Sequence, residues 1–446
     1  MRKIRYILSV WLCKMLIVAG KVAGKKSSSK PGAIAMKVCP DVLKILSKKV
    51  KKEIIAVCGT NGKTTTNNII DKILTDKGYR VVCNNVGANM LSGIVTAFIE
   101  KTDIFGKLSC DYATLEMDEA SAVKIFDHLS PSLMVITNLF RDQLDRYGEI
   151  DLTANYLKSA LDKAKDAKLL INGDDPVCAK IAKDSGRCIS FGINENLNIN
   201  LDETKEGQFC AYCGNKLTYN YYHYSQLGDY FCENCDFKRP QIDFVATGLN
   251  INDGLKFTVN GELDIDVNYR GFYNVYNILG AISAVSLLNV DLKDINEILS
   301  DYKPQIGRME AFYIGKPVVL NLAKNPAGFN QAIHTVLADQ RKKDIIVAVN
   351  DKENDGIDVS WIWDVDFEKL GDEKVSKLGF LGTRKYDLEL RFKYAEVNKE
   401  SKVYDDLKTA IEELLKSDSE ILYLLVNYSV IFEAQEILKE LEGKAK

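Results

Sequence analysis

The chain has 446 residues, of which 46% are hydrophobic and 27% charged, and its formal net charge is −3. This length corresponds to about three average domains, and the composition is that of a chain folded around apolar cores rather than a disordered one. The near-neutral charge argues against a dedicated nucleic-acid binder, and the apolar runs are too short or too interrupted by lysine to span a bilayer. Eleven cysteines, an odd number, indicate a reducing compartment rather than secretion.

The first forty residues carry nine basic side chains and no acidic one. Their spacing predicts a helix over 4–23, with Lys3, Lys14, Lys21 and Lys25 on one narrow stripe and apolar side chains around the rest. A signal peptide would need a convincing cleavage site, which does not follow. A helix packed on its own protein, with the lysines as its solvated face, is slightly favoured. An interfacial helix held against anionic lipid is the functional alternative.

From residue 53 the sequence alternates between strand and helix patterns. Such alternation predicts a parallel sheet covered by helices, which is an α/β fold. The predicted strands are 53–58, 80–84, 111–116, 133–137 and 168–172, and the predicted helices are 64–77, 88–100, 119–128 and 153–166.

A stretch rich in cysteine and tyrosine, 205–240, interrupts this alternation. Strand-like stretches return at 242–270, and a helix is predicted at 274–288. The alternation restarts after Pro304, which indicates a second, smaller, Rossmann-like α/β domain. Its predicted strands are 317–323, 344–350, 377–381 and 420–426, and its predicted helices are 326–340, 404–416 and 429–441. We therefore expect a basic N-terminal segment 1–50, a central domain 51–304 with 205–240 inserted, and a C-terminal domain 305–446.

A phosphate-binding loop is predicted directly after the first strand of the central domain. The apolar residues 53–58 are followed by Gly59-Thr60-Asn61-Gly62-Lys63-Thr64-Thr65 and then by a helix. Backbone N–H groups at such a helix N-terminus bind phosphate oxygens, while Lys63 neutralises the terminal phosphates and Thr64 offers its hydroxyl to Mg²⁺. Val57 stands where the general motif has a glycine, so the match is to a shorter form, G-T-x-G-K-T. A tight turn with a chance Gly-Lys-Thr is the alternative, and the correctly placed strand and helix disfavour it.

Four cysteines form two knuckles, Cys210-x2-Cys213 and Cys232-x2-Cys235, which are eighteen residues apart. Four thiolates at this spacing favour a closed tetrahedral Zn²⁺ site, which is structural because no coordination position stays open. A redox pair, an iron–sulfur site and coincidence are the alternatives. The other seven cysteines are scattered and are expected to be ordinary buried thiols.

The short phosphate loop is the signature of the Mur ligase superfamily, and this chain resembles that family from about residue 50 to its end. The motifs that carry the resemblance are, in chain order, 59–65, 114–121, 137–145, 172–176, 273–277, 307–310 and 325–326. The resemblance implies that Glu116 binds Mg²⁺ and that Arg308 reaches the ATP phosphates. It also implies that Asn274 and Asn277 open a helix beside the nucleotide.

Some positions depart from the family pattern. Gln143 stands where most of these ligases have a histidine that helps to hold a second Mg²⁺, and Lys324 replaces the histidine of the motif A-H-N-P. The lysine that many members carbamylate falls at Ala160, with Lys158 and Lys163 nearby but out of register. A second metal ion held in the usual way is therefore not implied.

The inserted zinc ribbon narrows the resemblance to the MurT family, the ligase subunits of lipid II isoglutaminyl synthase. The segments 324–331 and 355–364 resemble that family as well. The resemblance implies ATP-dependent activation of the α-carboxylate of D-glutamate in the lipid II stem peptide as an acyl phosphate. Ammonia from a GatD-like glutamine amidotransferase partner would then convert it to D-isoglutamine. The chain itself has only three histidines and shows no complete glutaminase site.

The family resemblance further implies that the ligase subunit lends an acid to the Cys–His pair of the partner. Asp355 is the first choice, with Asp351 and Asp358 behind it, although acids in a loop after a strand are usually solvated or turn-forming. The expected catalytic set is thus Asp355 together with Lys63, Glu116 and Arg308.

Two other classes of function remain to be weighed. One is a free-standing Mur-type or folylpolyglutamate-type ligase that adds an amino acid, against which the zinc ribbon and the missing histidine count. The other is a zinc-ribbon ATPase acting on nucleic acid, which the low basic content of the ribbon opposes. The expected location is the cytoplasm, and contact with the inner face of the plasma membrane stays open.

Overall fold

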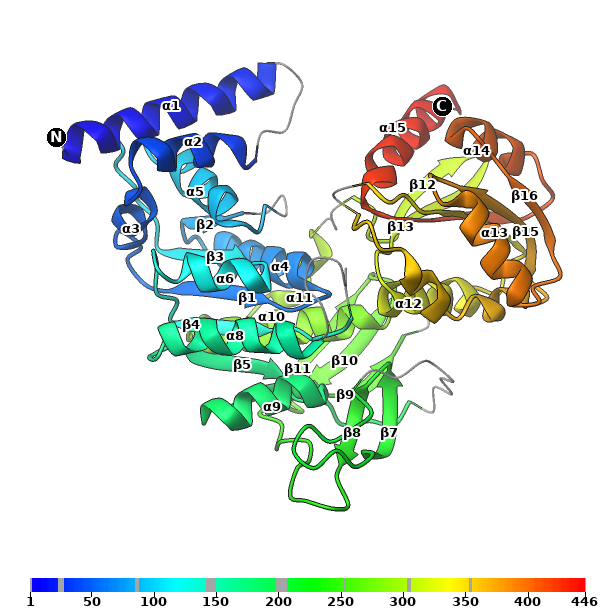
Figure 1. The fold of residues 1–446 in the computed structure, drawn as a ribbon, viewed down its shortest axis with the longest axis horizontal. Coiled ribbons are helices and arrows are strands. Elements are labelled where there is room, and N and C mark those ends of the chain that lie inside the picture. The colour runs from blue at the N-terminus through cyan, green and yellow to red at the C-terminus, as the bar shows by residue number, and fades with distance from the viewer. Residues whose placement is uncertain are drawn as a thin grey trace.

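Two sheets, each covered by helices, organise the chain in the computed structural model (Figure 1). The structure describes residues 2–22, 28–84, 88–141, 150–197, 207–251, 254–302, 306–352 and 355–445. The α/β class predicted from the alternating pattern is confirmed. We propose that each sheet and its helices form one domain, with the boundary near residue 304.

The central sheet has nine strands in the order β11-β10-β9-β6-β5-β4-β1-β3-β2. Strands β1 to β6 pair in parallel and β9 joins β6 in parallel, while β10 and β11 extend the sheet beyond β9 in antiparallel pairs. The bounds are β1 Ile54–Cys58, β2 Val81–Cys83, β3 Tyr112–Glu116, β4 Leu133–Ile136, β5 Lys168–Asn172, β6 Ile189–Ile193, β9 Phe244–Asn250, β10 Leu255–Val259 and β11 Leu263–Val267.

Helices cover both faces of this sheet, so its parallel strands are buried on both sides. Along β1, Ala56 and Cys58 face one apolar core, while Ile55 and Val57 face the other. The first core is covered by α5 Leu91–Glu100, α6 Glu119–Ile125, α8 Ile150–Lys163 and α9 Pro176–Ser185; the second is covered by α4 Lys63–Asp76, α10 Tyr273–Leu287 and α11 Ile295–Ser300.

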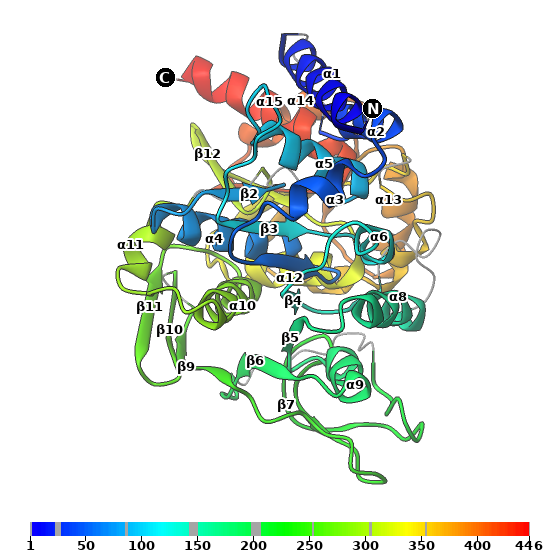
Figure 2. The same ribbon diagram turned by 90° about the vertical axis from the view of Figure 1, so that its left-hand side faces the viewer.

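Three N-terminal helices form an additional layer outside α5 (Figure 2). They are α1 Arg2–Val22, α2 Lys30–Val38 and α3 Val42–Ser47. The close crossing of α2 over α5 requires Gly32, because a Cβ there would lie 1.9 Å from the backbone oxygen of Ser92. Helix α1 is the outermost element of this layer, and α2 separates most of it from α5.

The C-terminal sheet has six strands in the order β12-β13-β17-β14-β15-β16, all parallel except the β12–β13 pair. The strands are β12 Glu310–Ile314, β13 Lys316–Leu322, β14 Lys343–Ala348, β15 Val375–Leu381, β16 Glu400–Val403 and β17 Ile421–Val426. The helices are α12 Pro326–Ala338, α13 Lys385–Tyr394, α14 Leu407–Leu415 and α15 Tyr428–Ala445, with two short 3₁₀ turns, Ser360–Asp364 and Phe367–Gly371.

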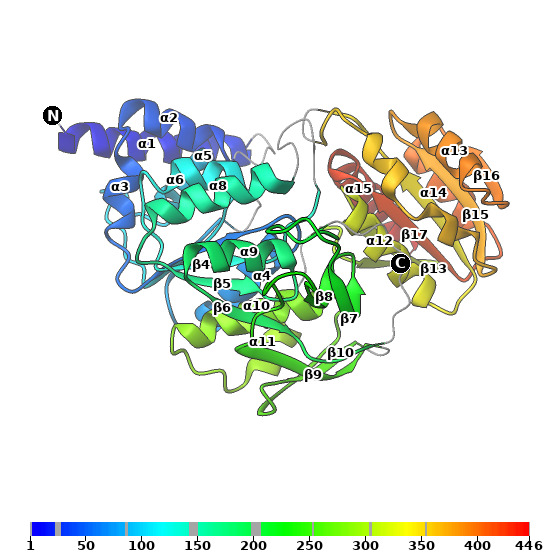
Figure 3. The same cartoon turned by 60° about the horizontal axis from the view of Figure 1, so that its bottom comes forward.

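The cysteine-rich insertion lies in the connection between two neighbouring parallel strands, β6 and β9. It contains the antiparallel hairpin of β7 Thr218–Tyr224 and β8 Leu227–Phe231. Figure 3 shows this hairpin in front of the central sheet, on the side of β9 and α9. A parallel pair needs a crossover connection, which is usually a helix; here the ribbon supplies it.

Most elements predicted from the sequence are confirmed within a few residues. The sequence analysis missed α2, α3, α9, α11, β6, β12, β16 and α13, together with the ribbon hairpin. The predicted helix 404–416 begins later, at Leu407, because the Asp406 side chain caps it by accepting from the backbone N–H of Thr409.

Candidate functional site

The predicted phosphate loop connects β1 to the N-terminus of α4. Two of its residues have positive φ, 122° at Gly59 and 82° at Gly62, a conformation that favours glycine. A Cβ at Gly62 would lie 2.1 Å from Oδ1 of Asn277, and one at Gly59 would lie 2.3 Å from Oγ1 of Thr137. Glycine is therefore needed at both positions, for the positive φ and for the close approach of the neighbouring side chains.

A carboxylate already lies inside this loop. Oε1 of Glu119 accepts hydrogen bonds from the backbone N–H of Gly59 (2.9 Å) and from Nζ of Lys63 (3.0 Å). Both charged side chains are buried, and Lys63 also donates to the backbone oxygen of Gly59. The loop thus binds an anionic oxygen with a main-chain N–H and a lysine, as phosphate binding requires.

Glu119 is a site residue that the sequence analysis missed. It lies three residues beyond Glu116, in the same motif, at the start of α6. An acidic residue in the first turn of a helix is common for electrostatic reasons alone. The local pattern therefore gave no signal that this carboxylate reaches back to the phosphate loop.

The segment after β4 braces the phosphate loop from outside. The N–H of Thr60 donates to the backbone oxygen of Asn138 (2.8 Å), and the N–H of Asn61 donates to Oδ1 of Asn138 (2.9 Å). The N–H of Phe140 donates to Oγ1 of Thr60 (2.9 Å). Gln143, at which the family pattern departs, lies outside the described residues.

Glu116 ends β3 beside the phosphate loop and is buried. Its Oε2 has no hydrogen-bond partner within the described parts of the chain. Burial raises the pKa of this carboxyl, while the charge of Lys63 and a hydrogen bond from Thr64 act in the opposite direction. A buried carboxylate with one unpartnered oxygen next to a threonine hydroxyl fits a hard divalent cation such as Mg²⁺.

The C-terminal domain contributes positive charge to the same place. Arg308 and Lys324 both lower the pKa of Glu116, so their charges lie near its carboxyl group. The two domains also touch directly, since Nδ2 of Asn325 donates to Oδ1 of Asn61 (3.1 Å). Arg308, predicted for the ATP phosphates, is therefore close to the metal-binding candidate Glu116.

The two predicted asparagines of α10 lie beside the loop. Nδ2 of Asn277 donates to Oδ1 of Asn274 (2.9 Å), and Oδ1 of Asn277 faces Gly62. Thr66 of α4 donates to the backbone oxygen of Asn277 (3.4 Å). The structure thus brings together the loop residues, Glu116, Arg308 and this asparagine pair.

Asp355 differs from the two other candidate acids of its loop. Asp351 pairs with Thr383 and Arg384, and Asp358 accepts from the N–H of Ser360. Asp355 is only 4% exposed; its Oδ1 accepts from the N–H of Ser429 (2.8 Å). Its Oδ2 is buried and has no hydrogen-bond partner among the described residues.

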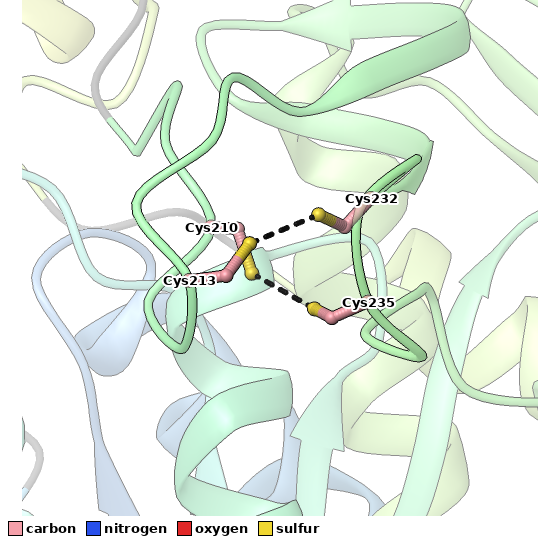
Figure 4. Close-up of side chains that lie close together, drawn as sticks. All are labelled: Cys210, Cys213, Cys232 and Cys235. Carbon is pink, nitrogen blue, oxygen red and sulfur yellow. Dashed lines mark hydrogen bonds between the residues drawn. The ribbon is translucent and has the colours of Figure 1, made fainter.

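The four predicted cysteines gather at the tip of the ribbon (Figure 4). All four sulfur atoms lie within 4.8 Å of one another, with separations of 3.4 Å for Cys213–Cys232 and 3.5 Å for Cys210–Cys235. Sulfur ligands about 2.3 Å from a tetrahedral Zn²⁺ lie about 3.8 Å apart. The geometry therefore fits a four-thiolate zinc site. Among the other seven cysteines, Cys188 is exposed, which differs from the expectation that they are all buried.

A buried network ties the ribbon to the central domain. Asp174, at the end of β5, accepts from Nε of Arg239 (2.7 Å) and from the hydroxyl of Tyr276 (2.7 Å). His223 of the ribbon hairpin contacts the same tyrosine hydroxyl through Nδ1 (2.6 Å). Burial alone would raise the pKa of Asp174, but the charge of Arg239 and the hydrogen bond with His223 lower it overall. The motif at 172–175 thus has a structural role that includes holding the ribbon.

The ribbon also reaches the brace of the phosphate loop. Nε2 of Gln226, in the hairpin turn, donates to the backbone oxygen of Leu139 (2.7 Å). Asp175 accepts from the N–H of Leu139 (2.7 Å), and its burial raises the pKa of this carboxyl to about 6. The turn of the ribbon hairpin and the phosphate loop are therefore connected through Leu139 and its neighbour Phe140.

The lysine that many Mur ligases modify has no counterpart here. Ala160 is fully buried in α8. Lys158 forms an ion pair with Asp184 (3.7 Å), and Lys163 forms one with Asp127 (2.6 Å). Neither lysine takes part in the site around the phosphate loop.

Comparison with known proteins identifies two family models within the chain. The model described as "Mur ligase middle domain" matches residues 57–237, and the model described as "MurT ligase C-terminal" matches residues 322–431. The first covers the phosphate loop and the four cysteines, and the second covers strands β14 to β17 and Asp355.

Two relatives that share one name match most of the chain. A protein of Staphylococcus aureus (strain N315) named "Lipid II isoglutaminyl synthase (glutamine-hydrolyzing) subunit MurT" is 37% identical over 87% of this chain and 88% of its own length. The protein of the same name from Streptococcus pneumoniae is 35% identical over 93% and 92%. Among solved structures, a pseudomurein peptide ligase type C from Methanothermus fervidus matches with a TM-score of 0.71 at 26% identity, covering 89% of this chain and 80% of that one.

Proposed function

Because this chain belongs to the MurT family of Mur ligases, we propose that it is the ATP-dependent ligase subunit of a lipid II isoglutaminyl synthase. Its substrate is the α-carboxylate of D-glutamate in the stem peptide of lipid II, and its product is D-isoglutamine. The observation that carries the proposal is the similarity to MurT subunits over 87% to 93% of this chain. The matched MurT C-terminal model includes Asp355, an acid that a free-standing ligase would not need for a partner.

The first chemical step is phosphoryl transfer. A carboxylate oxygen of the substrate attacks the γ-phosphorus of ATP, which gives an acyl phosphate and ADP. The backbone N–H groups of the phosphate loop and Lys63 bind the phosphate oxygens, and Arg308 stabilises the charge that spreads over the transferring group. Glu119 must leave Gly59 and Lys63 when phosphate binds, since the same donors serve both anions.

Thr64 and Glu116 are the residues that would hold Mg²⁺, and Asn274 and Asn277 would border the nucleotide. Bound Mg²⁺ neutralises negative charge on the phosphates. The burial of Glu116 keeps water from competing for its unpartnered oxygen.

The second step uses ammonia, which attacks the acyl carbonyl carbon and releases phosphate. We propose that a GatD-like glutamine amidotransferase subunit supplies it. Asp355 would orient the histidine of that subunit, as the third member of a triad does. Since Asp355 is buried, its loop has to shift when the partner docks.

The site of action that we propose is the cytoplasm, at the inner face of the plasma membrane. ATP and reduced thiols are available there, and lipid II is anchored in that membrane.

The experiment that tests the proposed function is an amidation assay with the complex. We expect this chain to co-purify with an amidotransferase subunit. The pair should convert lipid II to its amidated form with ATP and glutamine. ATP use that requires an added amino acid, and ignores glutamine and the partner, would instead favour a free-standing ligase.

We propose that Cys210, Cys213, Cys232 and Cys235 bind one structural Zn²⁺. Replacing Cys232 with serine should remove the ion, because three thiolates and a neutral hydroxyl hold Zn²⁺ far more weakly. We expect metal analysis to find one zinc per chain in the unsubstituted protein and almost none in Cys232→Ser. Hydrogen exchange of the β7–β8 hairpin should rise in the variant.

The matched control is Cys188→Ser, because Cys188 is exposed and lies outside the four-cysteine group. It should keep the full zinc content and the exchange protection of the hairpin. Iron instead of zinc, or a metal-free protein that was never exposed to a chelator, would contradict the zinc assignment.

A further inference from the structure

Helix α1 has three faces of different character. Its inner face packs on the protein through Tyr6, Ser9, Val10 and Cys13, which are buried. The opposite face consists of large apolar side chains at helical spacing that are exposed to solvent: Ile4, Leu8, Trp11, Met15, Val18 and Val22. This exposed set, which we call the apolar stripe, runs the whole length of the helix, about 30 Å.

The expectation of a helix packed on its own protein with only lysines in solvent was therefore half right. One face packs as expected, but the solvated surface is mainly apolar. Ile4 is 72% exposed, Trp11 50% and Val22 84%. Monomeric proteins rarely expose a continuous apolar surface of this length without a binding function.

A neighbouring loop extends the apolar stripe. The side chain of Trp11 donates from Nε1 to the backbone oxygen of Ile104 (2.6 Å), which fixes the loop beside the helix. Ile104 and Phe105 at its tip are 63% and 71% exposed. The acid of this loop, Asp103, is exposed, and its Oδ1 accepts from the N–H groups of Phe105 and Lys107. Two separate segments with exposed apolar side chains thus lie side by side.

Basic side chains flank the apolar stripe. At 100° per residue, Lys3, Lys14 and Lys21 lie along one edge of it and Arg5 lies along the other. Lys14 and Lys21 reach the C-terminus of α5, where Lys21 forms an exposed ion pair with Glu100 (3.1 Å). Such an exposed pair contributes little and can exchange for another anion.

We propose that α1 and the tip at Ile104 and Phe105 dock in the surface of an anionic phospholipid membrane, with the helix axis parallel to the bilayer. An apolar face with flanking lysines and a central tryptophan is the pattern of an interfacial helix, whose basic side chains lie at the level of the lipid phosphates. None of the helices in the described part of the chain has the length and apolar character needed to cross a membrane, so the contact lies in one leaflet.

Charge favours a membrane over a second copy of this chain. The first forty residues hold nine basic side chains and no acid, although the whole chain has a net charge of −3. Two copies that met through the apolar stripe would bring their lysine rows together, which costs electrostatic energy. A lipid surface with negative charge instead attracts each lysine near it. The exposed position of α1 at the outer edge of the molecule leaves a bilayer room to approach (Figures 1 and 2).

The test is flotation of the full chain with vesicles of phosphatidylcholine, with and without phosphatidylglycerol, in the absence of lipid II and ATP. We expect binding to the anionic vesicles, weaker binding to neutral ones, and a decrease with added salt. Leu8→Ser combined with Met15→Ser should weaken the partition at least about ten-fold, since two apolar side chains no longer enter the leaflet. Lys3→Gln combined with Lys14→Gln should weaken binding to anionic vesicles alone by a similar factor.

The matched control is Tyr386→Ser combined with Leu390→Ser on α13, where both side chains are exposed in the other domain. It should bind vesicles as the unsubstituted chain does. All these positions are on the surface, so the variants should fold. In a Trp363→Phe background, lipids that carry a quencher should quench the fluorescence of Trp11.

Three results would overturn the proposal: absence of vesicle binding, equal binding by the Leu8→Ser/Met15→Ser variant, or binding that depends on lipid II. Loss of a dimer in that variant would assign the apolar stripe to a second copy, and loss of the amidotransferase would assign it to the partner subunit. Amidation of detergent-solubilised lipid II should be unchanged in the variant, so the membrane proposal and the proposed enzymatic function succeed or fail separately.

Discussion

Replacing Lys63 with alanine should abolish both ATP turnover and amidation, whatever the source of ammonia. Lys63 lies at the start of α4. Among the contacts that the structure describes, its Nζ is the only charged side-chain group that donates to Oε1 of Glu119, the anionic oxygen inside the phosphate loop. Its charge stabilises the phosphates most when they carry the developing charge of the transition state. We expect kcat to fall by a factor of roughly 10³ or more, measured as release of ADP by the assembled complex with lipid II.

The control for this experiment is Lys72→Ala on the same helix. Lys72 is partly exposed and pairs only with Asp76, one turn further on, so its loss should leave the rate within a factor of about two. Since Lys63→Ala leaves Glu119 buried without its cation, thermal unfolding must be followed as well. An ADP release rate close to that of the unsubstituted complex, in a folded Lys63→Ala protein, would remove the phosphate loop from the mechanism.

Replacing Asp355 with asparagine should separate the two sources of ammonia. Asparagine keeps the size of the side chain and the oxygen that accepts from Ser429, but it loses the negative charge at the unpartnered Oδ2 position. An orienting carboxylate of a triad contributes up to about 10⁴ in rate. Glutamine-dependent amidation should therefore fall by about 10² to 10⁴, while amidation with free ammonia at alkaline pH should continue.

Two further variants make this result specific. Asp351→Asn and Asp358→Asn alter acids whose oxygens already have partners within the chain, so both should keep glutamine-dependent activity. Assembly of each complex has to be checked by co-purification. A damaged docking surface would also lower glutamine-dependent amidation while leaving amidation with free ammonia intact. If the Asp355→Asn complex assembles and still uses glutamine normally, the shared triad is wrong.

The sequence was sufficient for most of the central sheet because its strands are buried on both faces. The residues of β1, Ile54–Cys58, are all buried, and such a strand appears as a continuous apolar run. Strand β16, Glu400–Val403, lies at a sheet edge and is largely exposed, so it carried no apolar pattern and was missed. Strand β16 was missed because it lies at the sheet edge and faces solvent, and not because its residues have a low β-propensity.

At the candidate site, the sequence predicted the placement of residues that belong to a short motif, in which the spacing along one segment is enough to recognise them. The four cysteines come together as expected, and the loop with Lys63 has the predicted geometry. The contacts that it could not predict join distant segments: Glu119 with Gly59, and Arg239 with Asp174, which are 65 residues apart. The apolar stripe of α1 was ambiguous for another reason, since a helix that is apolar nearly all round does not reveal which side faces the protein.

The position of the ribbon between β6 and β9 has a consequence for how the chain folds. Residues at the start of this parallel pairing, Ser190 and Asp243, are 53 positions apart, and closing so long a loop is slow. Joining Cys210 to Cys235 through a metal ion would bypass 25 of these positions and roughly halve the loop. The gain in stability from halving a loop is only about 0.6 kcal/mol. The larger effect would be on the order of assembly. A nascent chain that bound an ion early would complete the central sheet from a preformed crossover, whereas a chain without the ion would have to pair β6 with β9 while the segment between them is still unfolded.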